Sequence, residues 1–305
     1  MTKSFLPRLL LFTAASVVIG LASCTKDKSD SEFTEAEQQE ATLASSEAEA
    51  ESDNVFSDVF DNVMGVNTEV GIGGTGVFSG RLGGTTGRVT QVDSVQCFVV
   101  TVIRLNATNP FPVKIILDFG AGCVGRDGRV RKGKIITTYT GRLIHPGATA
   151  TTVFENYFID SIKVQGTHIV NNISTSSAFK LNIQVQNAKL TRPNGNYHQW
   201  NSTRVITQGE GMITPGIPID DVFTVTGNAA GVVKRGNIIS TWESLITEPL
   251  RKRFNCRWIV KGAVKLTRHL GGTTHQAVLD YGQGTCDRNA TLTINGAAHN
   301  ILLPL

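Results

Sequence analysis

The feature that most constrains the fold is a long succession of short segments in which polar and apolar residues alternate. The clearest is Lys180–Gln186, KLNIQVQ, where every second residue is apolar. A period of two is that of a strand with one buried face. Similar segments recur from about residue 63 onward, separated by turn signals such as Asn194-Gly195, with no long helical period among them. We therefore expect an all-β domain over residues 63–305, an antiparallel meander forming a large sheet, barrel-like or sandwich.

The N-terminus is typical of a secretory signal. Lys3 and Arg8 flank the start of an apolar run from Leu9 to about Leu21, shorter than the ~20 residues that span a bilayer. The run ends in Leu21-Ala22-Ser23-Cys24, which resembles the lipobox of bacterial lipoproteins. In that family the peptide is cut before the cysteine, whose thiol is diacylated. The resemblance implies a signal peptide over residues 1–23 and lipid attachment at Cys24; the alternative is an ordinary signal peptide with a cysteine nearby.

Residues 24–62 form an acidic segment that contains twelve Asp and Glu residues. Its first half has few apolar groups to offset the entropy of ordering, which predicts a disordered tether. Its last part places Val55, Val59 and Val63 at a spacing of four residues. This spacing predicts a short N-terminal helix that docks on the β-rich domain.

The acidic segment hides an excess of positive charge in the rest of the chain. The whole chain has a net charge of +4, with 29 basic and 25 acidic residues. After Asn62, 25 basic and 13 acidic residues remain, a net charge of about +12. Such a field can attract an anionic partner, or it can reflect solvated strand faces that keep edges soluble, which we favour. Two clusters stand out: Arg126, Arg129, Arg131, Lys132 and Lys134, and Arg251, Lys252, Arg253 and Arg257.

An internal repeat explains a motif that resembles a nucleotide loop. ILDFGAGC, residues 116–123, has a counterpart in VLDYGQGTC, residues 278–286. Each follows a strand with another cysteine, Cys97 or Cys256, within related blocks at about 95–145 and 254–304. The glycines therefore belong to strand-end corners. The GxGxxG match after residue 119 and the DFG tripeptide are coincidences, because the rest of a dinucleotide or kinase site is missing.

The repeat also predicts a disulfide pattern. With Cys24 acylated, four cysteines remain in an oxidising compartment, and four allow three pairings. The repeat favours Cys97–Cys123 and Cys256–Cys286, because a hairpin brings the start of one strand beside the end of the next. A zinc site is disfavoured because zinc ribbons need close CxxC pairs and none occurs.

The remaining candidate residues carry weaker signals. Asp118 and Asp280, one in each corner, are either turn caps, which we favour, or a carboxylate pair. Tyr197, Trp200 and Trp242 are candidates for stacking on sugar rings, although Tyr197 and Trp200 fall on opposite faces of one strand. No HExxH, GxSxG or Walker sequence occurs. We expect no catalytic residue, no metal site and no cofactor.

Taken together, the lipobox, the acidic segment and the all-β body with paired corners resemble uncharacterised lipoproteins of Gram-negative Bacteroidota. The resemblance implies a lipid-anchored protein of the cell envelope, in the outer membrane. Expected partners are the membrane, through the N-terminal lipid, and an anionic glycan or an envelope protein, with no nucleic acid. We expect a non-enzymatic binding or structural module. The alternatives are a hydrolase of envelope or extracellular glycans that uses Asp118 or Asp280, and a lipid carrier with a continuous apolar concave face.

Overall fold

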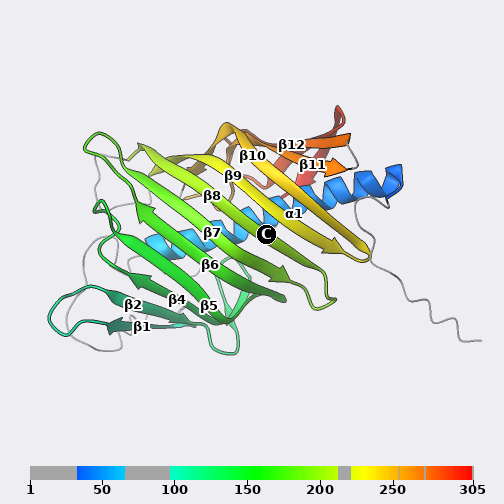
Figure 1. Ribbon diagram of the computed structural model, residues 1–305. Helices are drawn as coiled ribbons and strands as arrows, with labels where there is room; N and C mark the ends of the chain where they lie inside the picture. The colour runs from blue at the N-terminus through cyan, green and yellow to red at the C-terminus, as the bar shows by residue number, and fades with distance from the viewer. Residues whose placement is uncertain (1–32, 66–96, 212–220, 254, 271–272, 304–305) are drawn as a thin grey trace, which may run out of the picture.

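The computed structural model describes residues 33–65, 97–211, 221–253, 255–270 and 273–303 (Figure 1). Cys24 and the signal sequence lie outside these residues. The described chain contains one helix, α1 (Glu35–Met64), and fourteen strands. The strands are β1 (Val99–Arg104), β2 (Val113–Asp118), β3 (Cys123–Val124), β4 (Val130–Tyr139), β5 (Thr149–Ile159), β6 (Ile162–Asn172), β7 (Lys180–Thr191), β8 (Tyr197–Glu210), β9 (Val222–Arg235), β10 (Ile238–Arg253), β11 (Lys261–Leu270), β12 (Thr273–Gln283), β13 (Asn289–Ile294) and β14 (Ala297–Leu302).

The strands form a single antiparallel sheet in which neighbours in the chain are neighbours in space. Its order runs from β1 to β14 in sequence, except that the short β3 pairs only with β4. The expectation of an all-β antiparallel meander is therefore confirmed. Of the two arrangements left open, neither is adopted: β1 and β14 are the ends of the pairing order, so the described strands form one open, curved sheet.

Bulges in the strands curve the sheet. The register of β4 with β5 shifts between Lys132 and Lys134, where Gly133 has a positive φ of 74°. A Cβ on Gly133 would lie only 2.0 Å from the carbonyl oxygen of Asn156. A bulge bends its strand and increases the local twist, and glycine permits the close approach of the backbones. In β6, two strands further along the sheet, a similar register shift occurs around Gly166.

The acidic segment after residue 34 is a helix of 30 residues and not a flexible tether. Thr34 is its N-cap, in a capping box where the Thr34 hydroxyl accepts from the Glu37 amide and the Glu37 carboxylate accepts from the Thr34 amide. Glu, Ala and Gln, which dominate its first half, have high helix propensity. Gly65 ends the helix in the left-handed conformation, with φ 72°. The helix we expected is thus much longer than its apolar spacing indicated.

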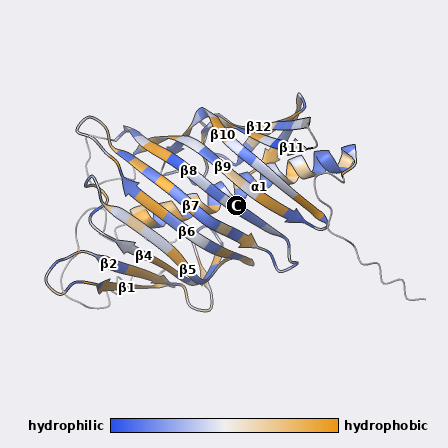
Figure 2. Ribbon diagram, in the orientation of Figure 1, coloured by the Kyte–Doolittle hydropathy of each residue, from blue (hydrophilic) through white to orange (hydrophobic). Residues whose placement is uncertain are grey.

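The helix α1 lies on the concave side of the sheet and crosses the strands obliquely (Figure 1). Its first half approaches the sheet through small residues, of which Ala41, Ala44, Ser45 and Ala48 are fully buried. Its second half buries larger apolar side chains, those of Val55, Val59 and Val63, as well as Phe56 and Phe60. Figure 2 shows hydrophilic and hydrophobic colours alternating along the helix. The helix therefore forms the core together with the concave face of the sheet.

The two cysteine-bearing corners are both closed by disulfides. Cys97 is joined to Cys123 and Cys256 to Cys286, the pairing that the repeat predicts. In the chain-entropy model, loops of 26 and 30 residues each contribute roughly 3–4 kcal/mol by restricting the unfolded chain. The bridges fasten opposite regions of the sheet, near β1–β4 and near β10–β12.

Candidate functional site

The interface between α1 and the concave face of the sheet, here called the trough, concentrates the charged residues of the fold. The helix has nine acidic residues and no basic ones. Six of the nine lie within ion-pair distance of basic side chains that the sheet and its loops point inward. The pairs are Glu47–Arg235, Glu49–Arg204, Glu51–Arg192, Asp53–Arg204, Asp58–Arg131 and Asp61–Lys252. The positive charge of the body is therefore largely matched by the chain's own helix.

Glu49 lies at the centre of the trough and is completely buried. One carboxylate oxygen accepts hydrogen bonds from the indole N–H groups of Trp200 and Trp242, at 2.8 and 3.2 Å. The other accepts from Nη2 of Arg204 and from the hydroxyl of Ser244, both at 2.8 Å. Four donors from β8 and β10 thus converge on one carboxylate. A buried carboxylate is tolerated only with such partners.

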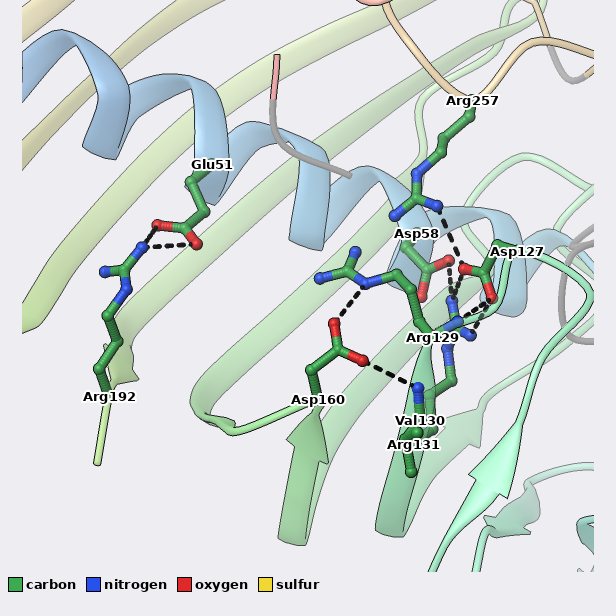
Figure 3. Close-up of polar contacts among 9 residues, drawn as sticks. All are labelled: Glu51, Asp58, Asp127, Arg129, Val130, Arg131, Asp160, Arg192 and Arg257. Atoms are coloured by element: carbon green, nitrogen blue, oxygen red, sulfur yellow. Dashed lines mark hydrogen bonds and ion pairs between the residues drawn. The ribbon is translucent and has the colours of Figure 1, made fainter. Parts of the chain in front are cut away.

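A second charged cluster joins the C-terminal half of α1 to both disulfide-bearing regions (Figure 3). The guanidinium of Arg131 donates two hydrogen bonds to Asp127, at 3.0 and 2.8 Å, and one to Asp58 on α1, at 3.0 Å. Arg257, the residue after Cys256, also donates to Asp127, at 3.2 Å. Arg129 pairs with Asp160 at 3.2 Å. Asp127 therefore ties together β4 and the loop before β11, which are remote in the sheet.

Ion pairing dominates the electrostatics of this cluster. Burial alone would lower the pKa of Arg131, but the charges of Asp58 and Asp127 outweigh it and raise that pKa above its ordinary value. Burial would likewise raise the pKa of Asp127, but the hydrogen bonds and charge of Arg131 hold it below its ordinary value. Both groups are therefore charged at neutral pH, and the cluster is a true ion-pair network.

Two other acids of α1 behave in the opposite way. Burial raises the pKa of Asp61 to about 6, although Lys252 lies 3.1 Å away and opposes the shift. Burial also raises the pKa of Asp53, against the charge of Arg204, whose Nη2 lies 3.6 Å from it. Asp53 and Asp61 are thus acids of the trough whose pKa is raised by burial.

A further buried arginine and an Arg–Glu–His group complete the attachment of α1. Arg268 is fully buried and donates to the Thr42 hydroxyl at 2.9 Å and to the Gln38 carbonyl at 3.1 Å. Glu51 accepts from Arg192, at 2.8 and 2.6 Å, as Figure 3 shows, and lies 3.0 Å from the buried ring of His198. Burial and the charges of Arg192 and Arg235 lower the pKa of His198 to about 3, so the ring is neutral at physiological pH.

A half-open cavity of about 40 Å³ lies in the trough, between the middle of α1 and strands β6 to β10. At ~10–15 Å³ for each water molecule, it has room for roughly three. With the open space at its mouth, the hollow amounts to about 450 Å³. Phe56 and Phe60 of α1, together with Val225, Leu250 and Ile259, form apolar walls. The partly exposed Asp53 and Ser57 place the mouth beside the helix.

Three polar side chains in the cavity wall have atoms without a hydrogen-bond partner among the described residues. They are both ring nitrogens of His168, the hydroxyl of Ser202, and Nε and Nη1 of Arg204. All three residues are at least nine-tenths buried. Burial lowers the pKa of His168 to about 3, so its ring is neutral. Buried polar groups are normally satisfied, so these atoms indicate that the cavity holds water or a ligand.

The candidate side chains identified from the sequence lie in three different environments: turns, the buried core and the outer face of β8. Asp118 and Asp280 each accept a hydrogen bond from the amide two residues on, at 2.9 and 2.8 Å, in their own turns. The turn-cap interpretation therefore describes their geometry. Trp200 and Trp242 are 2% exposed, so the idea that they stack on sugar rings at the surface is wrong. Tyr197 lies on the other face of β8, as expected, under the ammonium of Lys189.

The basic clusters also require correction. Arg131 and Lys252, one from each cluster, are 0% and 2% exposed and pair with α1, so they are not solvated strand-face charges. The condition set for a lipid carrier, a continuous apolar concave face, is not met in the described structure. That face carries Arg131, Arg204 and Arg268, and α1 covers it.

The residues that the sequence did not single out are His168, Ser202 and Arg204 of the cavity and Glu49 of the helix. Two signals could have indicated them. Thr34 and Glu37 have the S/T-x-x-E spacing of a capping box, which predicts a helix start there. In β8, the inward positions His198, Trp200, Ser202 and Arg204 are polar or aromatic, which is unusual for a core-facing strand.

The fold and the site together define a class of architecture: an open antiparallel sheet whose concave face is filled by an acidic helix of the same chain. No protein-family model, curated protein sequence or solved structure matches this chain. No helix in the described ranges is both long and apolar enough to cross a bilayer. The same residues contain no group of three or more side chains placed to hold a metal ion.

Proposed function

We propose that this protein is a lipid-anchored, non-enzymatic binding protein of the Gram-negative cell envelope, with its binding site in the trough. The observation that carries the proposal is the half-open cavity with unpartnered polar atoms of His168, Ser202 and Arg204 in its wall. Apolar walls with a few convergent polar groups are typical of small-molecule sites. The lipobox at Leu21–Cys24 and the two disulfides support an anchored protein outside the cytoplasm.

Binding is favoured over catalysis by the geometry of the candidate groups. A general base or an activated nucleophile needs a partner that orients it. Neither nitrogen of His168 has such a partner in the described chain, and the carboxylates of Asp118 and Asp280 are engaged with their own turns. The same cavity is well suited to hold a ligand without transforming it.

The anchor is tested by replacing Cys24 with Ser and fractionating the producing cells. We expect the wild-type protein to sediment with membranes and Cys24→Ser to become soluble. Unchanged sedimentation of the variant would contradict the lipid anchor, but it would leave the binding site untouched.

The binding site is tested with ligand-observed NMR on the unlipidated Cys24→Ser protein and a library of small fragments. Ser202→Val replaces a hydroxyl in the cavity wall with a larger, apolar side chain, at a strand position that favours a β-branched residue. Thr203→Val, on the opposite, exposed face of β8, is the matched control. We expect fragments to bind the parent and the control but not Ser202→Val. If no fragment binds, or if binding survives Ser202→Val, the cavity is not a binding site.

A further inference from the structure

The cavity has a chemical character that indicates what it binds. Ser202 and Arg204 are two residues apart on β8, so their side chains point to the same, inward face. Arg204 uses Nη2 for Glu49, while Nε and Nη1 have no partner among the described residues. The Ser202 hydroxyl is likewise unpartnered and adds a third donor. One strand therefore places a positive charge and two side chains with unpartnered donors, Ser202 and Arg204, in the wall of a single small space.

The charges around the cavity decide which acceptor these donors suit. The charged and titratable groups that line it are Asp53 of α1, His168 of β6, Arg204 of β8 and Lys252 of β10. Behind them, Glu49 contacts Arg204, Asp61 contacts Lys252, and Tyr281 of β12 interacts with the charge of Asp53. Glu49 is saturated by four donors, and Lys252 pairs with Asp61. Asp53 is the acid at the mouth, and within the described ranges its ion-pair contact is a long one, of 3.6 Å, with Arg204.

The size of the cavity matches a head group rather than a whole molecule. A volume of about 40 Å³ accepts roughly three water molecules, or the three heavy atoms of a carboxylate. The remaining atoms of a ligand must then lie in the wider hollow of about 450 Å³, whose apolar walls include Phe60, Leu250 and Ile259. An apolar body gains free energy there by leaving water.

We propose that the cavity binds a small monocarboxylate with an apolar body, its carboxylate held by Arg204 and Ser202 and its body packed against Phe60, Leu250 and Ile259. This inference rests on the proposed binding function and specifies its ligand. Because a hydrogen bond between two oppositely charged groups is stronger than one from a guanidinium to a neutral amide oxygen, the anion is preferred over a neutral amide of the same shape. His168, which is neutral and fully buried, supplies a further donor or acceptor in the cavity wall.

Asp53 gives this binding a dependence on pH. Its pKa is already raised by burial, and a carboxylate bound beside Arg204 raises it further by repulsion and by competing for that arginine. Binding therefore takes up a proton when Asp53 is ionised in the free protein. We expect affinity for the carboxylate to increase as the pH is lowered, and Asp53→Asn to remove most of this dependence.

The test is calorimetric titration of the unlipidated protein with hexanoate and with hexanamide, which has the same shape and no charge. We expect hexanoate to bind about tenfold more tightly. Arg204→Lys keeps a cation for Glu49 but lacks the two unpartnered N–H groups, so it should lose most of this preference. Lys189→Arg, on the outward face of β7, is a control that should change nothing. Circular dichroism of each variant establishes that it is folded.

The outcomes separate this inference from the function on which it rests. Equal affinity for hexanoate and hexanamide, or a preference that survives in folded Arg204→Lys, would overturn the carboxylate assignment and leave the binding function intact. If neither compound binds while other fragments bind and are blocked by Ser202→Val, the ligand class is again wrong. If no fragment binds at all, the cavity holds water only and both proposals fail. If Arg204→Lys does not fold, Ser202→Ala takes its place, with a several-fold loss of hexanoate affinity expected and no loss contradicting the assignment.

Discussion

Replacement of Glu49 is the most direct test of how the fold is held together. Glu49→Ala removes the one carboxylate on which Trp200, Trp242, Arg204 and Ser244 converge. Removing one partner of a buried ion pair typically costs 3–5 kcal/mol, because the other charge is left without compensation. Asp53, 3.6 Å from Arg204, offsets part of this cost. Water that enters the space left by the side chain can satisfy some of the other donors. We therefore expect the free energy of unfolding to fall by about 3–5 kcal/mol.

The measurement is denaturant unfolding of the disulfide-intact protein, followed by tryptophan fluorescence and far-ultraviolet circular dichroism. Glu40→Ala, at an exposed position of the same helix, is the control and should change stability by less than about 0.5 kcal/mol. A second comparison isolates the charge. Glu49→Leu combined with Arg204→Met should be more stable than Glu49→Leu alone, because the double variant leaves no buried charge behind.

Two results would refute this reasoning. If Glu49→Ala costs less than about 1 kcal/mol, the helix is not held by the buried network, and the apolar contacts of Phe56 and Phe60 suffice. If the double variant is no more stable than Glu49→Leu, the cost does not come from an uncompensated Arg204. In either case the buried charges would not be what fixes α1 as a wall of the cavity.

Three further predictions concern the turn aspartates, the disulfides and the dependence of stability on pH. Asp118→Ala and Asp280→Ala should each lower the free energy of unfolding by about 1 kcal/mol, measured with denaturant, because a turn cap is lost. Neither variant should alter fragment binding. Loss of binding in a folded variant would show that the carboxylate belongs to a binding site. Non-reducing peptide mapping should recover the 97–123 and 256–286 disulfides, and a disulfide between residues 97 and 256 would contradict the repeat. Replacing Cys256 and Cys286 together with Ser should lower the free energy of unfolding by roughly 3–4 kcal/mol. The pKa of Asp61 is raised to about 6 in the folded state, whereas in the unfolded chain it lies near its ordinary value of 3.8. Between about pH 4 and 6 the folded protein therefore keeps a proton that the unfolded chain has released. The free energy of unfolding should fall across this pH range as the pH rises. The difference in the free energy of unfolding between wild type and Asp61→Asn isolates this loss, which amounts to up to about 3 kcal/mol at ~1.4 kcal/mol for each pKa unit. If that difference does not change from pH 4 to pH 7, the prediction is contradicted.

Much of the sheet could be predicted from the sequence because its signals are local. Alternation in Lys180–Gln186 depends only on which residues face the core, and it predicted β7 correctly. The disulfide pairing depended on two similar corners in one chain. The bulges were not predicted. The positive φ of Asn187 and the close contact of Gly166 with Ala188 arise from how β6 and β7 fit together, which neither strand reveals alone.

The helix and the trough were harder to predict because their stabilising partners lie far away in the sequence. Residues 35–54 look solvated, with acids at most turns and few apolar side chains. Their order depends on Arg192, Arg204 and Arg235, which lie 141 to 188 positions away. The same arginines, taken by themselves, look like charges on solvated strand faces. Neither the acids of α1 nor the arginines of the strands reveal their pairing in the sequence, because only the curvature of the sheet brings them together.

The structure of α1 also changes how the body can sit at a membrane. If residues 24–62 were a disordered tether, the body could lie up to ~140 Å from an acylated Cys24, at ~3.6 Å for each residue. Because the chain is helical from Glu35 and that helix is held in the sheet, only the residues between Cys24 and Glu35 remain as a connection, with a reach of at most ~40 Å. A lipid at Cys24 would therefore hold the N-terminal end of α1 close to the bilayer. The acidic helix, in the proposed anchored protein, is the mechanical link between lipid and sheet.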